Sequence, residues 1–380
     1  MRSLWIIVSV VVVVIAAIFV GIRLTQKPTP QEQVIRIGAI LPLTGKLSFL
    51  GEPEKNALIL AMYNLKHKGV NVQVKFYDSQ GDPKTAVSVI QKAVSADGIK
   101  VFLASLSGVC MALKPVAESQ DIFLGAVAFH PEITINAKHT VRFLYDGKRE
   151  AEKVLDIIIK EKPNLLFILA SRDPLSEVQV RDVLRPGLSK AKIDFQEEWF
   201  ELGAKDYRSQ IAKLRSVSPS FVIVLGYGSD IKLLLSQMLE QNVIISLKVI
   251  GGIGFLELKN QVPFEAIKNV VFIGPKFIAE NSQAFQELCK QFKNRWGIDE
   301  VPYDAAYMYD ALHILAECLA KDPQKTPESL RSTLLSRKFM GVTGPLSFDK
   351  MGNLQSELAI MRYGKKFELL IVNSVKEGQQ

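Results

Sequence analysis

One apolar run, Ile35–Leu41, constrains the fold of this chain more than any other feature. The run ends at Pro42, and a short polar loop leads to Pro53, which suits a first helical turn. Apolar residues then recur at helical spacing, at Ala57, Leu58, Ala61, Met62 and Leu65. The pattern predicts a buried strand, a loop and a helix. Ligands of parallel α/β sheets bind beyond the carboxyl ends of strands, so Thr44 and Ser48 in this loop are candidate ligand-binding residues, with helix capping as the alternative.

The alternation of strand and helix continues along most of the chain. Further strands are expected at 72–77, 101–104, 122–128, 141–145, 165–169, 193–200, 221–225, 249–252 and 270–273. Strands that alternate with helices form right-handed parallel sheets. The pattern restarts at Lys148, which predicts two doubly wound sheets in tandem, and therefore two lobes.

The C-terminal part has a different pattern. Helices are expected at about 282–296, 303–320 and 327–335, followed by short strands at 344–348, 358–362 and 367–372. Three consecutive helices cannot form a lobe alone. We expect them to pack on the first lobe, and the last strands to return to the second.

The N-terminus contains an apolar segment, Leu4–Ile22, of nineteen residues without a charge. This length spans a bilayer as a helix, whereas the apolar part of a cleavable signal is shorter. Residues 4–22 are therefore predicted to be an uncleaved membrane anchor, and residues 25–33 a tether. The prediction places the ligand-binding part of the chain outside the cytoplasm, attached to the cytoplasmic membrane.

Charge and composition argue against several classes of protein. The net charge of +8 is spread along the chain without a basic run, which does not favour nucleic-acid binding. Three cysteines without C-x-x-C spacing and four scattered histidines predict no metal site, and no cofactor is expected. Cys289 and Cys318 could pair, although buried free thiols are favoured. Gly226-Tyr227-Gly228-Ser229 lacks the second glycine of a nucleophile elbow, so no catalytic arrangement is predicted.

Seven segments resemble one known family. IRIGAILPLTGKLSFLGEPEKNALILA resembles the start of the mature type I periplasmic solute-binding proteins of the Leu/Ile/Val-binding family. YDSQGDPKTAV, FLGAVAFHPEIT, AKDYRSQIAKL, FVIVLGYG, VPYDAAYMYDAL and GVTGPLSFDKMGNL follow in the order of that family. The resemblance implies two lobes joined by three crossovers, near 145–148, 274–277 and 341–344. Lobe 1 would comprise 34–146 plus 275–341, lobe 2 would comprise 147–274 plus 342–373, and 374–380 would be a tail.

The resemblance also implies a ligand site between the lobes. Members that bind α-amino acids hold the carboxylate on two first-lobe loops and the ammonium on a second-lobe carboxylate. In the first loop Gly108 stands where serine is usual, directly after Ser105 and Ser107. In the second loop Ala128 matches a small residue and Phe129 replaces a threonine.

The second lobe departs further from the family pattern. Ile253, after Gly252, stands where the ammonium-binding glutamate is usual, while Tyr227 matches a cleft tyrosine. A buried ammonium without a counter-ion is unfavourable, so unless Asp146 or Asp230 substitutes, α-amino acids are expected to bind poorly. A small, partly apolar ligand is favoured.

Several of these residues also have a structural interpretation. Tyr227 and Phe129 could fill the base of a lobe, Ser105 and Ser107 could cap a helix, and Asp146 could form a turn at the hinge. Tyr303, Tyr307 and Tyr309 are assigned to the core and lobe surface rather than to the ligand site.

The sequence thus favours a membrane-tethered binding protein that presents a small ligand to an ABC-type importer of amino acids or related compounds. The alternative is a non-transport module that senses a ligand, or regulates the envelope, through a protein partner.

Overall fold

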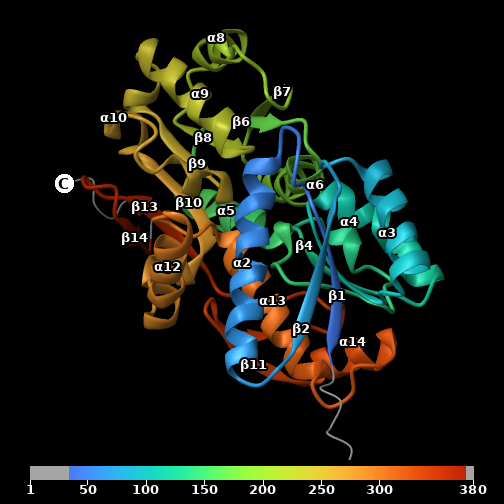
Figure 1. Ribbon diagram of the computed structural model, residues 1–380. Coiled ribbons are helices and arrows are strands. Elements are labelled where there is room, and N and C mark those ends of the chain that lie inside the picture. The colour runs from blue at the N-terminus through green and yellow to red at the C-terminus, as the bar shows by residue number, and fades with distance from the viewer. Residues whose placement is uncertain (1–33, 374–380) are drawn as a thin grey trace, which may run out of the picture.

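The computed structural model describes residues 34–373, which form two halves, each built on one β-sheet (Figure 1). The first sheet has the order β2-β1-β3-β4-β5, and all its strands are parallel. Its strands are β1 (Ile35–Leu41), β2 (Val72–Asp78), β3 (Val101–Ser105), β4 (Phe123–Val127) and β5 (Thr140–Arg142).

Helices cover both faces of the first sheet because its strands are apolar on both faces. Ile37 and Leu41 of β1 pack on one face, with α2 (Ser48–His67), α12 (Gln283–Trp296), α13 (Tyr303–Leu319) and α14 (Pro327–Ser336). Ile40 packs on the other face, with α3 (Pro83–Asp97) and α4 (Ser107–Ser119). The three C-terminal helices thus pack on the first half, which confirms the prediction.

The second sheet has seven strands in the order β14-β13-β10-β9-β8-β6-β7. A parallel core consists of β6 (Leu166–Ser171), β7 (Phe195–Phe200), β8 (Phe221–Leu225), β9 (Lys248–Gly251) and β10 (Val270–Pro275). The returning strands, β13 (Leu358–Tyr363) and β14 (Leu369–Ile371), extend it in antiparallel fashion. The doubly wound α/β fold with parallel sheets is confirmed.

Helices also cover both faces of the second sheet. One face carries α5 (Gly147–Glu161), α6 (Pro174–Gln179), the π-helical segment η2 (Val180–Leu184) and α7 (Arg185–Ala191). The other carries α8 (Arg208–Val217), α9 (Gly228–Glu240), the 3-10 segments η3 (Ile244–Ser246) and η4 (Ile253–Leu258), and α10 (Phe264–Ile267). Two further short elements are η1 (Pro131–Ile133) and α11 (Lys276–Glu280).

The chain passes between the halves after β5 and after β10, as predicted, but the third passage differs. Residues 341–344 form the turn of a hairpin between β11 (Lys338–Gly341) and β12 (Gly344–Ser347). The carboxylate of Asp310 on α13 holds this turn, because it accepts hydrogen bonds from the backbone N–H of Val342 (2.9 Å) and Thr343 (3.0 Å). Leu346 is buried in the first core, so the chain first joins the second sheet at β13. The lobe boundaries stay a proposal.

Further predictions concern the two ends of the chain and its cysteines. The membrane span at 4–22, the tether and the tail 374–380 lie outside the described residues. Within residues 34–373, no helix has both the length and the apolar character to cross a membrane. Cys110, Cys289 and Cys318 are free thiols.

Candidate functional site

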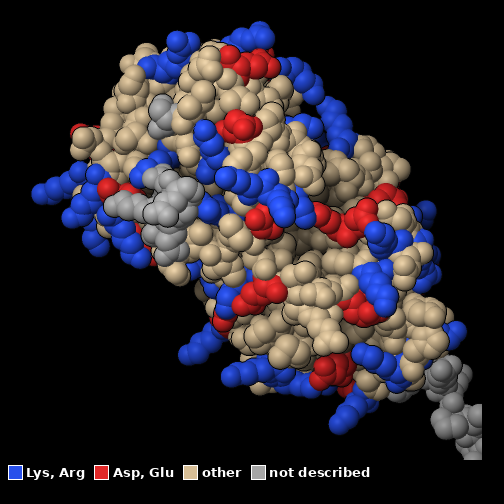
Figure 2. Space-filling model, turned by 90° about the vertical axis from the view of Figure 1, so that its left-hand side faces the viewer, with Lys and Arg blue, Asp and Glu red and all other residues tan. Residues whose placement is uncertain are grey.

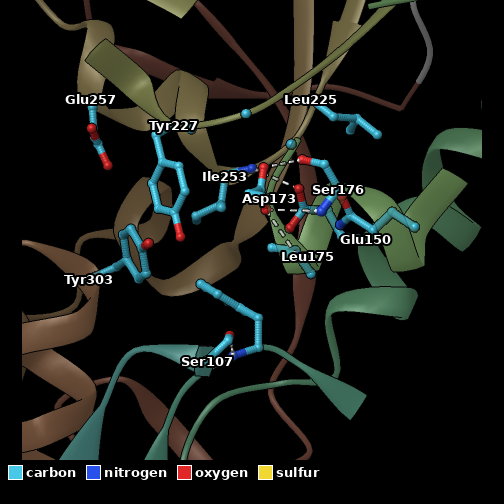
Figure 3. A pocket seen from close by; sticks show the side chains of 15 residues that line it. Ser107, Glu150, Asp173, Leu175, Ser176, Leu225, Tyr227, Ile253, Glu257 and Tyr303 are labelled. Carbon is cyan, nitrogen blue, oxygen red and sulfur yellow. Dashed lines mark hydrogen bonds between the residues drawn. The ribbon is translucent and has the colours of Figure 1, made fainter. Parts of the chain in front are cut away.

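A pocket lies between the two halves and is lined by both (Figure 3). It encloses about 510 Å³ of empty space, part of it open to solvent. The first half contributes Ser107, Phe129 and Tyr303, and the second half contributes Glu150, Asp173, Leu175, Ser176, Gln179, Leu225, Gly226, Tyr227, Gly252, Ile253, Gly254 and Glu257.

The positions of these residues follow from the topology. Ser107 follows β3, Phe129 follows β4, Tyr227 follows β8, and Ile253 follows β9. In parallel sheets such segments gather at the carboxyl ends of the strands, where ligands bind. Here the two sheets direct these ends toward the same gap.

On the first half, Ser107 and Phe129 are fixed by hydrogen bonds. The Ser107 hydroxyl oxygen accepts from the backbone N–H groups of Phe129 and His130, both at 3.3 Å. The buried guanidinium of Arg142 donates to the Phe129 carbonyl (2.7 Å) and to Asn353 (2.6 Å). The Phe129 ring lies 5.1 Å from that of Tyr145 and 6.0 Å from that of Tyr303, centroid to centroid.

Glu150 on α5 is a buried carboxylate that lines the pocket. It accepts hydrogen bonds from the backbone N–H of Ile253 (2.8 Å) and the Tyr145 hydroxyl (3.1 Å). Burial raises the pKa of Glu150 to about 7, although these hydrogen bonds and one from Gln179 oppose the shift. Gly252 leaves the space for this carboxylate, because a Cβ there would lie 1.4 Å from Glu150 Oε1.

Asp173 is a second buried carboxylate, and it caps α6. It accepts from the backbone N–H of Leu175 (3.0 Å), the backbone N–H of Ser176 (3.1 Å) and the Ser176 hydroxyl (2.6 Å). Burial raises its pKa despite these bonds. Asp173 therefore shapes the wall, and its acceptor capacity is largely used within its own loop.

Glu257, at the end of η4, is the third carboxylate of the pocket. Burial, with Asp304 as a nearby negative charge, raises its pKa to about 7, and the backbone N–H of Gly228 opposes the shift. Figure 3 shows Glu257 on the same side of the pocket as Tyr227 and Tyr303, away from Asp173 and Ser176. All three side chains line the pocket, and the negative charge of Glu257 contributes to the raised pKa of both tyrosines.

Five of the residues predicted from the sequence line the pocket: Ser107, Phe129, Tyr227, Gly252 and Ile253. Six others lie outside it, for identifiable reasons. The Thr44 hydroxyl donates to Asp78 (2.5 Å), and Ser48 begins α2. Ser105 is buried and donates to Glu54 (2.6 Å).

The remaining three predicted residues have structural positions. Gly108 lies in the first turn of α4, and Ala128 is buried against the core formed with α3 and α4. Asp146 caps α5 at the backbone N–H of Lys148 (2.9 Å) and pairs with Arg142 (3.0 Å).

Neither of the two carboxylates considered as substitutes for the missing glutamate at Ile253 reaches the pocket, and the poor binding of α-amino acids stays a prediction. Asp146 is engaged at the hinge, and Asp230 accepts from Gly203 N–H (2.9 Å) and the Tyr207 hydroxyl (2.6 Å). Neither lines the pocket. Glu257 lines the pocket, four residues beyond Ile253 in the same segment, so this segment does contribute a carboxylate at another position.

Sequence reasoning missed Glu150, Asp173 and Glu257, and it assigned Tyr303 to the core. One signal was present for Glu150, which shares the buried stripe of α5 with Ala151, Val154 and Ile158. A charged residue on an apolar stripe is a candidate for a functional role. Glu257 has no comparable signal, because the direction of a side chain in a 3-10 segment depends on the surrounding loops.

Comparisons with known proteins agree with this geometry. The model of the family described as "Periplasmic binding protein" matches residues 34–368. A leucine-, isoleucine-, valine-, threonine- and alanine-binding protein of Pseudomonas aeruginosa is 24% identical over 337 residues, which cover 85% of this chain and 87% of that protein.

Two solved structures have the same fold at low identity. The branched-chain amino acid transporter substrate binding protein LivJ from Streptococcus pneumoniae, in complex with isoleucine, has a TM-score of 0.77 at 18% identity and covers 90% of this chain and 99% of its own. A solute binding protein of an ABC transporter from Rhodopseudomonas palustris, in complex with 3,4-dihydroxybenzoic acid, has a TM-score of 0.78 at 20% identity and covers 89% and 96%. This chain belongs to the periplasmic binding protein family, and it is a solute-binding protein rather than an enzyme.

Because Glu150 is buried, we expect its contribution to the free energy of unfolding to fall as the pH rises. Its pKa is about 7 in the folded protein, above the ordinary value of 4.5 that applies when the chain is unfolded. Its contribution is therefore fully present below about pH 4.5 and is lost as the pH rises through about 7, a loss of about 3 kcal/mol at most. In denaturant unfolding between about pH 5 and pH 8, Glu150→Gln should lose less stability than the wild type.

Glu152→Gln is the matched control, because Glu152 is an exposed carboxylate on the same helix. It should keep the wild-type pH profile. An unchanged slope in Glu150→Gln would contradict the assignment of a buried, protonatable Glu150.

The contact between Gly252 and Glu150 makes a second prediction. In Gly252→Ala the new methyl group displaces the carboxylate from the Ile253 N–H, which should destabilise the protein by about 1–3 kcal/mol. Adding Glu150→Ala should make the combined effect clearly less than additive in urea denaturation. Gly108→Ala, whose Cβ would lie 3.7 Å from Pro83, should be nearly neutral. Simple additivity of the Gly252 and Glu150 changes would rule out the proposed contact.

Proposed function

We propose that this chain is the ligand receptor of an ABC-type importer, and that it captures a small amino acid or related organic compound between its two halves. The observation that carries the proposal is the pocket itself, since its walls come from both halves and from the carboxyl ends of both sheets. Relatives of known name support the class of ligand, because they bind branched-chain amino acids or a small aromatic acid.

The geometry explains how capture would be coupled to closure. A ligand in the pocket touches Ser107, Phe129 and Tyr303 on one half and Tyr227 and Glu257 on the other. Contacts to both halves exist together only when the halves are close, so the ligand stabilises the closed arrangement by its differential affinity. The closed form is the state that a permease would recognise.

Residues 4–22 would tether the receptor to the membrane and residues 25–33 would act as a linker. The uncharged length of the segment supports this part of the proposal. A tethered receptor stays close to its permease, so the outcome of capture depends less on free diffusion.

A thermal-shift screen tests ligand capture. Amino acids, short-chain acids, amides, sugars and nucleosides are added to the purified chain, and binding to the folded state alone adds about 2.7 kcal/mol at a hundredfold excess over Kd. We expect at least one compound to raise the Tm, and Tyr227→Ala to abolish the shift. Tyr63→Ala, at an exposed tyrosine of α2, is the control and should keep it. A shift that persists in Tyr227→Ala would move ligand binding away from this pocket.

A further inference from the structure

The charge of the pocket is unbalanced. Three of its lining residues, Glu150, Asp173 and Glu257, are carboxylates, and none of the described residues that line it is Lys, Arg or His. This imbalance does not follow from composition, because the chain has a net charge of +8. Figure 2 shows Lys and Arg side chains at many places on one face, interspersed with Asp and Glu. The acidic pocket is thus a local feature of a basic protein.

The unbalanced charge is concentrated at Glu257. Glu150 is held by Ile253, Tyr145 and Gln179, and Asp173 is held by the backbone and hydroxyl donors of its own loop. For Glu257, the backbone N–H of Gly228 is the one hydrogen-bond donor in the described part of the chain that counteracts the rise of its pKa. A carboxylate accepts about four hydrogen bonds, so Glu257 retains capacity for a donor in the pocket.

Aromatic rings stand beside this carboxylate. Tyr227 reaches the pocket from the second half and Tyr303 from the first, and Figure 3 shows both on the side of Glu257. The Phe129 ring, 6.0 Å from that of Tyr303, extends the aromatic wall. The faces of aromatic rings attract cations, and a carboxylate with such rings is the arrangement that recognises a substituted ammonium group.

We infer that the ligand is an organic cation, an amine or a quaternary ammonium compound, whose charged nitrogen lies among Glu257, Tyr227 and Tyr303. The inference rests on the proposed function, that the cleft captures a small ligand. Because two of these residues belong to one half and one to the other, the positive charge of the ligand bridges the halves. The same charge determines specificity: it compensates the buried Glu257, whereas an anion finds no Lys, Arg or His among the described residues that line the pocket.

Ligands that share a carbon skeleton but differ in charge test this assignment. The full chain is titrated in a calorimeter with isopentylamine, leucine and 4-methylpentanoate, then with phenethylamine, phenylalanine and 3-phenylpropanoate, and finally with choline and its uncharged isostere 3,3-dimethylbutanol. In at least one series the cation should bind at least about tenfold more tightly than its zwitterionic, anionic or uncharged counterpart.

Charge-neutral variants identify the residue responsible. Glu257→Gln keeps the shape of the side chain and should weaken binding of the cation by about tenfold or more, while affinity for the uncharged isostere stays the same. The Tm of Glu257→Gln should equal or exceed that of the wild type, because the variant removes a negative charge near Asp304. Glu265→Gln, at an exposed carboxylate on α10 of the same half, should bind all ligands as the wild type does.

The outcomes separate this inference from the proposed function. Tighter binding of a zwitterion or an anion than of its cation overturns the inference and leaves ligand capture intact. An equal loss of affinity for charged and uncharged ligands in Glu257→Gln assigns Glu257 a structural role and also overturns it. Binding of no compound in any series contradicts ligand capture, and the inference then fails with it.

Discussion

The pocket exists because two parallel sheets direct the carboxyl ends of their strands into one gap. Each strand is followed by a loop or a helix start at that end, so residues far apart in the sequence, such as Ser107, Tyr227 and Ile253, meet around a space of about 510 Å³. The three passages of the chain keep the halves together while leaving this space accessible. The chemistry of the pocket thus depends on the loops, whereas its existence depends on the topology.

Within this frame, buried carboxylates give the site its character. Glu150 holds the backbone of Ile253 in place, and Gly252 provides the room for it. Asp173 orders the start of α6, and Glu257 faces the aromatic side of the pocket. Burying a carboxylate is unfavourable unless hydrogen-bond donors or positive charges compensate it. Glu150, Asp173 and Glu257 differ in how many hydrogen-bond donors they have. The hydrogen-bonding capacity of Glu150 and Asp173 is largely used within the protein, whereas Glu257 keeps acceptor capacity for a ligand.

Much of this fold is predictable from the sequence because periodicity reports burial directly. Two sheets can be identified from the apolar strands, the apolar faces of the helices and the break at Lys148. The three consecutive C-terminal helices, α12 to α14, were correctly expected to pack on the first sheet. The third passage was placed too early, because the turn at Val342 and Thr343 depends on Asp310, more than thirty residues away. Similarly, Thr44 has the hydroxyl and the loop position of a ligand-binding residue, but Asp78 accepts its hydrogen bond. Such tertiary partners are invisible to local patterns, and the same limit hid Glu257, whose place in the pocket depends on the path of η4 after Ile253.

The central claim is that one small ligand binds between the halves. Native mass spectrometry tests it most directly, on the chain purified from the organism that produces it. The account predicts a mass increase of one small organic molecule per chain in the wild type. Tyr303→Ala, in the first half, and Tyr227→Ala, in the second, should each lose that increase, because the ligand depends on both walls. Retention of the bound mass in both variants, or a wild type that carries and accepts no small molecule, would contradict it.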